Sequence, residues 1–356
     1  MKVLLLSKYP RMGASSRLRS LQYIPALAEE GVEVTVSGLF DEQYLNSLYE
    51  EGNRPGIRSL LLYLKRLFVL LTVYRYDLVW IEKELFPFIP AIFEKLLSFS
   101  GIKYVVDYDD AIFHNYDLSS NGLIRTVLGH KIDIVMAHSA CVIAGNKYLA
   151  YHARQAGASR VEIIPTVVDH SRYRQARTAK SNNLIIGWIG SPSTQCYVVD
   201  IKEALRAACD KSCARLMLVG ATEDVVEHFA GIPVDVVPWS EDTEAENIAK
   251  MDVGIMPLVD GPWEKGKCGY KLIQYMASGV PVVASPVGVN VEIVNNYGCG
   301  CLAQSTDEWA ASLLELLSDH EVRNTFGRAG RNAVEKRYSL QTQAPILADI
   351  LKSAAK

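Results

Sequence analysis

The amino-acid sequence predicts an α/β protein of two domains, each built on a parallel β-sheet with helices on its faces. Its 356 residues suffice for two domains of ordinary size. Short apolar runs rich in β-branched residues, such as residues 280–284, are typical of strands buried on both faces of a parallel sheet. These runs alternate with segments whose apolar residues recur at helical spacing, which indicates repeated βαβ units.

Composition narrows the class of protein. The chain is 49% apolar and 22% charged, as expected of a globular protein with a substantial core. A net charge of −3 provides no overall basic field for binding nucleic acid. Seven cysteines at irregular positions fit a reducing, cytoplasmic compartment better than a disulfide framework. The apolar run within residues 1–7 is too short for a signal peptide, so we expect it to be the first strand.

The first half of the chain begins with a βαβ pattern. Strands are expected at residues 2–7 and 32–37, with a helix at 17–30 between them. The loop at 8–16 has no G-x-G-x-x-G pattern, so the dinucleotide-binding fingerprint is absent. Further strands of the same sheet are expected at residues 77–81, 103–107 and 141–146.

An acidic cluster follows the strand at 103–107. Asp107, Asp109 and Asp110 lie within four positions, and His114 comes shortly after them. Clustered carboxylate oxygens suit a hard divalent cation, so one interpretation is a metal site. The other is that Asp109 and Asp110 bind hydroxyl groups of a ligand. His114 is then either a contact to this ligand or a structural histidine.

The most informative segment of the chain is residues 267–292. It predicts a helix that ends at Gly279, followed by the buried strand 280–284 and a turn out of the sheet. Lys267 and Lys271 lie at the N-terminus of this helix, around Gly269. Backbone N–H groups and ammonium groups together suit a diphosphate, such as that of a sugar nucleotide.

The run Tyr-Met-Ala-Ser-Gly-Val-Pro-Val-Val-Ala-Ser at 275–285 resembles that of GT4-type retaining glycosyltransferases, or glycosyl transferases group 1. The resemblance is firm for residues 184–338 and looser for 1–170. It implies the GT-B fold, in which two Rossmann-like domains have parallel sheets that face each other across a cleft. The sequence departs from the family where two glutamates precede this run: the second falls on Gln274 and the first near Gly266.

The resemblance also implies site residues. Asp109, Asp110 and His114 become contacts of the sugar or acceptor, because GT-B enzymes neutralise the diphosphate with protein groups and not with a metal. Ser191 stands where the family has an arginine, so we expect the missing cations to come from Lys267 and Lys271. Pro238-Trp239 is expected near the nucleotide base. The expected donor-binding residues are Gly13, Arg17, Gly190, Ser191, Ser193, Trp239, Lys267, Gly269, Tyr270, Lys271 and Gln274. Arg19 is either a ligand contact or a solvated loop residue.

Residues 52–76 form an unusual segment. They include Arg54, Arg58, Lys65, Arg66 and Arg75, no acidic side chain, and many leucines. The segment is too charged to span a membrane. A basic, strongly apolar helix is typical of docking on anionic lipid, and the alternative is a core helix whose cations reach the solvent.

The sequence therefore predicts four parts. Residues 1–170 form an acceptor-side domain, 171–183 a linker and 184–339 the nucleotide-sugar domain, and a helix at 340–356 packs back on the first domain. The resemblance implies transfer of a sugar from a nucleoside-diphosphate sugar to a hydroxyl of a glycan or lipid-linked glycan, with retention and without a cofactor. We also expect a role in cell-surface polysaccharide synthesis, in the cytoplasm or on the inner face of the membrane. The alternatives are a sugar-nucleotide epimerase and an inactive protein that only binds the nucleotide sugar.

Overall fold

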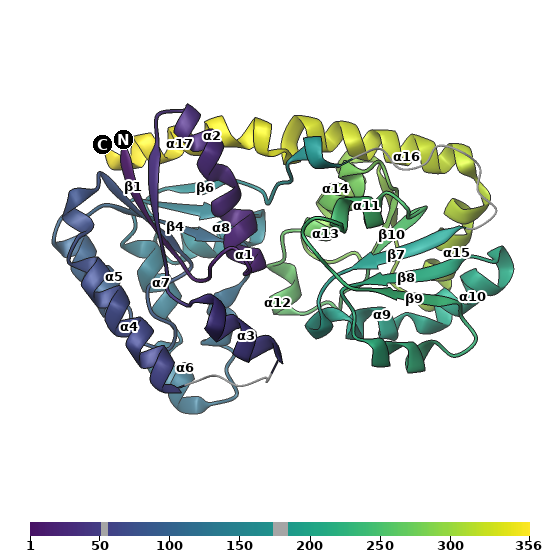
Figure 1. Cartoon of the computed structure of the whole chain (residues 1–356), viewed down its shortest axis with the longest axis horizontal. Coiled ribbons are helices and arrows are strands. Elements are labelled where there is room, and N and C mark those ends of the chain that lie inside the picture. Colours follow the sequence, from purple (N-terminus) through teal and green to yellow (C-terminus); the bar gives the residue numbers. More distant parts are fainter. Residues whose placement is uncertain (51–55, 174–183) are drawn as a thin grey trace. The chain divides into compact units, whose positions relative to one another are not determined.

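The computed structural model describes residues 1–50, 56–173 and 184–356. The chain divides into two compact units (Figure 1). Unit 1 comprises Met1–Thr166, Gly266–Cys268 and Leu340–Lys356, whereas unit 2 comprises Val167–Lys265 and Gly269–Ser339. Residues 174–183 of the expected linker lie outside the described residues.

Unit 1 is built on a parallel sheet with the strand order β2-β1-β3-β4-β5-β6. Its strands are β1 (Lys2–Ser7), β2 (Glu33–Gly38), β3 (Leu78–Glu82), β4 (Tyr104–Tyr108), β5 (Cys141–Ala144) and β6 (Val161–Ile163). Every residue of β3, β4 and β5 is buried, as expected of parallel strands covered on both faces. Helix α17 (Leu340–Ala355) packs on α2 and on strands β3 and β4 of this sheet.

The other helices of unit 1 are α1 (Ala14–Arg19), α2 (Ile24–Glu29), α3 (Glu42–Glu50), α4 (Gly56–Leu70), α5 (Ile92–Phe99), α6 (Gly122–Leu128), α7 (Lys131–Ala137) and α8 (Lys147–Gln155). The single helix predicted at 17–30 is wrong, because the structure divides it into α1, a short 3-10 turn and α2. Ser20 leaves helical dihedral angles, and Pro25 lies in the first turn of α2. Proline is favoured in a first turn because its missing N–H has no partner to lose there.

Unit 2 contains a second parallel sheet with the order β12-β11-β10-β7-β8-β9. Its strands are β7 (Ile185–Ile189), β8 (Arg215–Val219), β9 (Val234–Val237), β10 (Val253–Met256), β11 (Val282–Ala284) and β12 (Gly300–Leu302). Counted from β7, this is the strand order of doubly wound dinucleotide-binding domains. The predicted strand at 280–284 is present in its last three residues, as β11.

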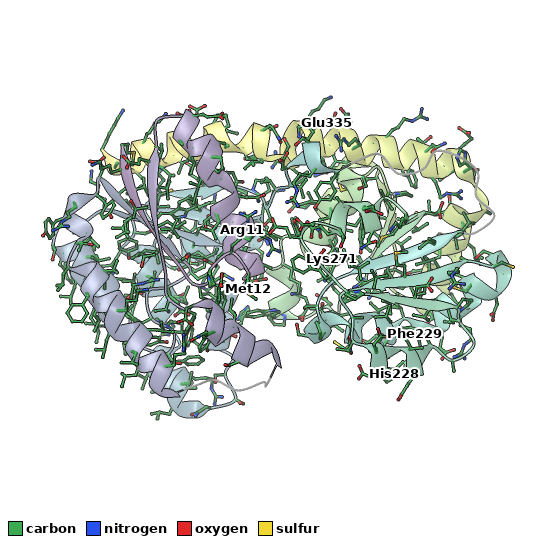
Figure 2. The ribbon with its side chains drawn as sticks, viewed as in Figure 1. Arg11, Met12, His228, Phe229, Lys271 and Glu335 are labelled. Atoms are coloured by element: carbon green, nitrogen blue, oxygen red, sulfur yellow. The ribbon has the colours of Figure 1, made fainter. Side chains whose placement is uncertain are left out.

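The helices of unit 2 are α9 (Cys196–Asp200), α10 (Lys202–Ser212), α11 (Glu244–Ile248), α12 (Pro262–Lys265), α13 (Tyr270–Ala277), α14 (Val289–Tyr297), α15 (Thr306–Ser318) and α16 (His320–Ala333). Successive strand residues point to opposite faces of the sheet: Leu216 and Leu218 join one hydrophobic cluster, and Met217 joins another. The 3-10 turn at 223–229 also has a buried and an exposed side: Phe229 is buried and His228 is exposed (Figure 2).

Helix α13 is fixed on the sheet by Tyr275. Its hydroxyl accepts a hydrogen bond from Ile189 N at 3.0 Å and donates one to Ile255 O at 3.2 Å, so it joins α13 to β7 and β10. Its ring lies directly over Gly254, where a Cβ atom would overlap the ring carbons. Gly279, with φ of 71°, ends the segment in the left-handed conformation that the sequence predicted. Tyr275 thereby sets the position of the N-terminus of α13.

Among the residues described, we find no helix that is both long and apolar enough to cross a bilayer.

Gly254→Ala should lower the free energy of unfolding by about 1–3 kcal/mol, because the new methyl group overpacks the Tyr275 ring. Gly56→Ala is the control: a Cβ there meets no atom within 4 Å, so stability should stay within about 1 kcal/mol of wild type. Urea denaturation measures both. A Gly254→Ala protein as stable as wild type would show that α13 can shift away from the strands.

Candidate functional site

Each sheet has a topological switch point, at which successive connections leave in opposite directions. It lies between β1 and β3 in unit 1 and between β7 and β10 in unit 2. Open parallel sheets bind ligands outside the carboxyl ends of the strands at such points. We therefore describe the loops at these two places, each within its own unit.

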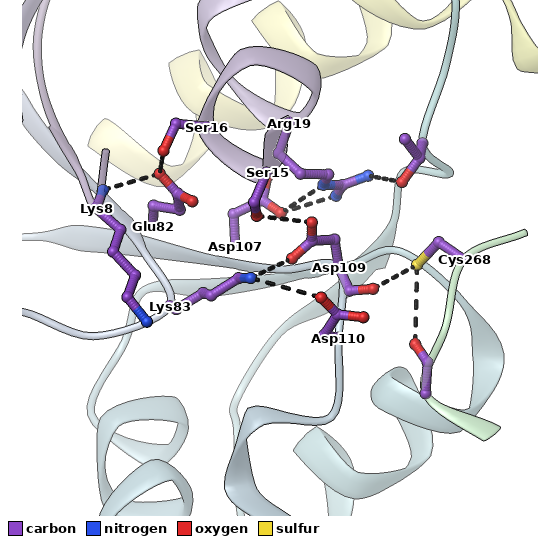
Figure 3. A network of polar contacts seen from close by, with 12 residues as sticks. Lys8, Ser15, Ser16, Arg19, Glu82, Lys83, Asp107, Asp109, Asp110 and Cys268 are labelled. Carbon is purple, nitrogen blue, oxygen red and sulfur yellow. Dashed lines mark hydrogen bonds and ion pairs between the residues drawn. The ribbon is translucent and has the colours of Figure 1, made fainter. Parts of the chain in front are cut away.

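In unit 1, Lys83 directly follows β3 and is buried against two carboxylates (Figure 3). Its Nζ lies 2.8 Å from Asp109 Oδ1 and 3.7 Å from Asp110 Oδ2. Ser15 Oγ donates a hydrogen bond of 2.7 Å to Asp109 Oδ2. Lys83 has φ of 66°, a conformation that is uncommon outside glycine. The two carboxylates that the sequence singled out thus face an ammonium group of the protein itself.

Burial and charge act against each other in this cluster. Burial alone would lower the pKa of Lys83, but Asp109 and Asp110 outweigh it and raise the pKa well above its ordinary value. Burial would raise the pKa of Asp109, yet Lys83 and Arg19 lower it. Burial and the charge of Asp109 raise the pKa of Asp110, and Lys83 and Lys267 offset this only in part. Asp110 is therefore the more basic carboxylate of the two.

Arg19 and Asp107 form a second buried ion pair in unit 1. The Arg19 guanidinium, from α1, donates to Asp107 Oδ1 from Nε at 2.9 Å and from Nη2 at 2.8 Å, and to Ile164 O from Nη1 at 2.9 Å. Burial raises the pKa of Asp107 to about 6, although Arg19 acts to lower it. The interpretation of Arg19 as a solvated loop residue is wrong: it is 2% exposed, since its carboxylate partner lies inside the domain.

Glu82, the last residue of β3, holds the loop that follows β1. Its Oε2 accepts from Lys8 N at 2.9 Å and from Ser16 Oγ at 2.5 Å. Burial, and then the charge of Lys83, lower the pKa of Lys8. Because two ammonium groups at the switch point repel each other, an anion placed between them would be stabilised.

The segment that precedes α13 contains Lys265 and Lys267. Three of its residues, Gly266–Cys268, belong to unit 1. Asn146 Nδ2 donates to Gly266 O at 2.8 Å and to Lys267 O at 3.1 Å. Cys268 Sγ donates to Asp109 O at 3.1 Å, and burial raises the pKa of this thiol to about 12. Lys267 is thus held on unit 1 near Asp110, whereas Lys271 lies on α13 in unit 2.

The remaining candidates of unit 1 have structural partners. His114 Nδ1 lies 2.9 Å from Asp117 Oδ1, and its Nε2 lies 2.9 Å from Tyr148 Oη. Gly13 has no room for a side chain, because a Cβ atom would overlap Tyr9. Arg17 Nη1 donates to Arg11 O at 3.2 Å.

In unit 2, the loop after β7 offers small polar groups. A Cβ atom on Gly190 would overlap the Trp188 ring, so the backbone approaches the sheet closely there. Ser191 and Ser193 are exposed, and their hydroxyl oxygens lie 3.0 Å apart. Lys271, labelled in Figure 2, lies in the first turn of α13. Its Nζ lies 5.3 Å from the centre of the Trp188 ring. Gly269 caps this helix with φ of 68°. The residues predicted for the diphosphate in unit 2 therefore surround the carboxyl end of β7.

A series of hydrogen bonds between side chains begins at Gln274 on α13. Gln274 Nε2 donates to Tyr173 Oη at 3.3 Å, Tyr173 Oη donates to Glu244 Oε1 at 3.1 Å, and Trp239 Nε1 donates to Glu244 Oε2 at 3.0 Å. Trp239 is 38% exposed, whereas Tyr173, Glu244 and Gln274 are buried. Tyr270 also hydrogen-bonds the Tyr173 side chain.

Sequence reasoning missed Lys83, Lys8, Asn146 and Glu244. The signal available was a cation near the end of a predicted strand: Lys8 directly follows the strand predicted at 2–7, and Lys83 lies two residues after the one predicted at 77–81. No signal pointed to Asn146 or Glu244, because their partners are distant along the chain. Within the described ranges, no group of three or more His, Cys, Asp or Glu side chains is arranged to hold a metal ion.

Comparison with known proteins places this fold in a class. Residues 183–319, within unit 2, match the family model "Glycosyl transferases group 1", which confirms the resemblance predicted from the sequence. No curated protein sequence matches the chain significantly.

Solved structures match the whole chain. HepE from Anabaena, in complex with UDP and glucose, is 19% identical with a TM-score of 0.72, covering 99% of this chain and 100% of its own. Sucrose-phosphate synthase from Thermosynechococcus elongatus is 15% identical, with a TM-score of 0.72 and coverage of 99% and 98%. WaaG, a glycosyltransferase involved in lipopolysaccharide biosynthesis, is 15% identical, with a TM-score of 0.70 and coverage of 99% of both chains. The predicted fold class is confirmed: this is a GT-B fold with two Rossmann-like domains.

Lys83→Met should lower the free energy of unfolding by about 3–5 kcal/mol, because it leaves Asp109 and Asp110 buried without their cation. Lys2→Met, at an exposed lysine of the same unit, should change it by less than about 0.5 kcal/mol. Guanidinium denaturation at neutral pH compares them. Equal stability of the two variants would mean that the carboxylates do not depend on Lys83.

Proposed function

We propose that this protein is a glycosyltransferase that moves a sugar from a nucleoside-diphosphate sugar to a hydroxyl of a glycan or lipid-linked glycan. The observation that carries the proposal is the constellation at the carboxyl end of β7: Gly190, Ser191 and the N-terminus of α13 with Lys271. Backbone N–H groups, hydroxyls and an ammonium group at a switch point suit a diphosphate. The match to group 1 glycosyltransferases supports it.

The donor nucleotide is proposed to bind unit 2. Tyr270, Lys271 and Ser193 contact the diphosphate, and the exposed ring of Trp239 contacts the base. HepE was solved with UDP and glucose, which supports a nucleotide-sugar donor of this kind. Ser191 stands where the resemblance leads us to expect an arginine, and Lys271 on α13 is proposed to supply the missing positive charge.

Unit 1 is proposed to supply the acceptor-side chemistry. Asp110, the more basic carboxylate, accepts a hydrogen bond from a sugar or acceptor hydroxyl, and Asp109 stays ionised against Lys83. Lys267 adds a positive charge near them for the leaving diphosphate, whose charge a preorganised cation stabilises as it develops. We further propose that the anomeric configuration is retained and that no divalent metal is needed.

Incubation with a panel of nucleotide sugars and glycan acceptors, with and without EDTA, tests this function. Transfer or slow donor hydrolysis that resists EDTA supports it. Interconversion of donor sugars would identify an epimerase, and binding without turnover an inactive sugar-nucleotide-binding protein. Loss of activity in EDTA and recovery with Mg²⁺ or Mn²⁺ would show that a metal takes part.

Lys271→Ala should weaken binding of a nucleoside diphosphate by about 1.5–3 kcal/mol, the size of a hydrogen bond to a charged group. Lys250→Ala is the matched control in the same unit: Lys250 is exposed and pairs with Glu246 on α11. Titration calorimetry with UDP, GDP and ADP measures both variants. Unchanged affinity in a folded Lys271→Ala protein would remove this lysine from the donor site.

Helix α4, within the segment expected to dock on lipid, exposes an apolar face. Leu60, Leu61, Leu64 and Phe68 are 61%, 61%, 43% and 70% exposed and share one helical face. On α5, Ile92, Leu96 and Phe99 are exposed in the same manner. Aromatic packing bridges the two helices, from Tyr63 through Phe86 to Phe93.

One of the cations expected on this surface, Arg66, is buried, so that part of the prediction is wrong. Arg66 is 2% exposed and donates to Ser7 O and Ser37 O, because its guanidinium caps carbonyls at the strand ends. Arg58 pairs with Asp41 at 2.6 Å. Arg54 lies outside the described residues. Lys65, on α4, and Arg75, in the turn that follows it, are exposed. We propose that this face docks on anionic lipid at the cytoplasmic side and brings the protein to a lipid-linked acceptor used in cell-surface polysaccharide synthesis.

Replacing Lys65 and Arg75 with Glu should weaken binding to phosphatidylglycerol vesicles by about 30-fold, since each cation near an anionic surface contributes about 1 kcal/mol. Replacing Leu61 and Phe68 with Ser should also release the protein. The control exchanges Lys211 and Lys336, exposed in unit 2, for Glu. Cosedimentation at increasing salt measures all three. Binding that is indifferent to both sets of changes would make this face structural.

A further inference from the structure

The buried hydrogen-bonded chain of side chains from Gln274 to Trp239 contains one carboxylate, that of Glu244. The group 1 pattern places a glutamate at position 274, but here that residue is a glutamine. The structure places a carboxylate on the other side of Tyr173, at Glu244 in the first turn of α11. Tyr173, Glu244 and Gln274 are only 5%, 6% and 3% exposed.

The donors and acceptors of these hydrogen bonds can be assigned from the number of protons that each side chain carries. The Tyr173 hydroxyl has one proton, and Glu244 Oε1 can only accept it. Gln274 must therefore turn its amide N–H toward Tyr173 Oη, as the 3.3 Å contact from Nε2 has it. The other oxygen of Glu244 accepts from the Trp239 indole N–H, so the position of Trp239 depends on the same carboxylate.

A second group of the donor site depends on Tyr173. Tyr270, in the first turn of α13, hydrogen-bonds the Tyr173 side chain. The chain thus joins Trp239, expected near the base, to Tyr270, expected near the diphosphate. Two elements distant in sequence, α11 and α13, are linked through one hydroxyl group.

We infer that Tyr173, Glu244 and Gln274 are positioning residues that set Trp239 and Tyr270 for the nucleotide. This inference rests on the proposed function, in that the ligand is the donor nucleotide of unit 2. A glutamate at position 274 would have no proton to share with Tyr173, whose own proton is bound by Glu244. Two carboxylates would compete for one hydroxyl hydrogen in a buried place.

The test exchanges the carboxylate and the amide across Tyr173. Gln274→Glu alone should weaken binding of the nucleotide by about tenfold, because its carboxylate has no donor. Adding Glu244→Gln should restore affinity to within about threefold of wild type. In the double variant the amide of residue 244 donates to Tyr173 Oη and accepts from Trp239, and Tyr173 donates to the carboxylate at 274.

Glu246→Gln, an exposed position of the same helix, is the control for the second change and should not rescue Gln274→Glu. Tyr173→Phe removes the hydroxyl, so the rescue should disappear in that background. Calorimetric titration with UDP, GDP and ADP gives the affinity, and thermal unfolding is recorded for each variant. A purely structural role would change the melting temperature and leave the affinity of the folded protein unchanged.

Three results overturn the inference. One is a folded Gln274→Glu protein that binds as tightly as wild type. Another is a folded double variant that stays as weak as the single one. The third is rescue that persists without the Tyr173 hydroxyl. If wild type itself binds none of the three nucleotides, the proposed function fails and the inference fails with it, which separates this case from the other three.

Discussion

Parallel pairing of all the strands is the constraint on which the rest of this structure depends. In a parallel sheet, every strand ends at the same edge, so the loops that carry polar chemistry collect there. The order of the strands then selects two positions, one after β1 and β3 and one after β7 and β10. Lys83 and Gly190 follow β3 and β7 at these positions. The residues of each candidate site come from loops far apart in the sequence because the sheet brings their strand ends together.

Burial determines how the charges of unit 1 behave. A carboxylate in an apolar setting favours its protonated form, and a neighbouring cation opposes this. Asp109, with Lys83 at 2.8 Å, stays on the ionised side, whereas Asp110, at 3.7 Å, moves the other way. The pKa values of these two neighbours shift in opposite directions, because Lys83 and Arg19 outweigh burial at Asp109, whereas burial and the charge of Asp109 raise the pKa of Asp110. Such divergence is common where a site needs both a fixed charge and a hydrogen-bond acceptor.

Basic residues of α4 have two different roles, one inside unit 1 and one on its surface. On α4, Arg66 turns inward to bond carbonyls at the ends of strands, whereas Lys65, one position earlier, is exposed among leucines. Adjacent positions on a helix point about 100° apart, so a run of cations cannot all face one side. A count of basic residues in the sequence therefore overestimates the charge available to a membrane surface.

The sequence by itself determined the two-domain α/β class, the positions of most strands and the resemblance of residues 184–338, since these depend on local periodicity and contiguous motifs. It also singled out Asp109, Asp110, Lys267 and Lys271, whose roles stay predictions. It could not determine that Arg19 is buried, that Lys83 pairs with the acidic cluster, or that Glu244 and Gln274 both bond to Tyr173. Each of these depends on a partner brought near by the sheet from far along the chain. Hydrogen bonds and ion pairs between such partners leave no periodic signal, and only the tertiary structure decides them.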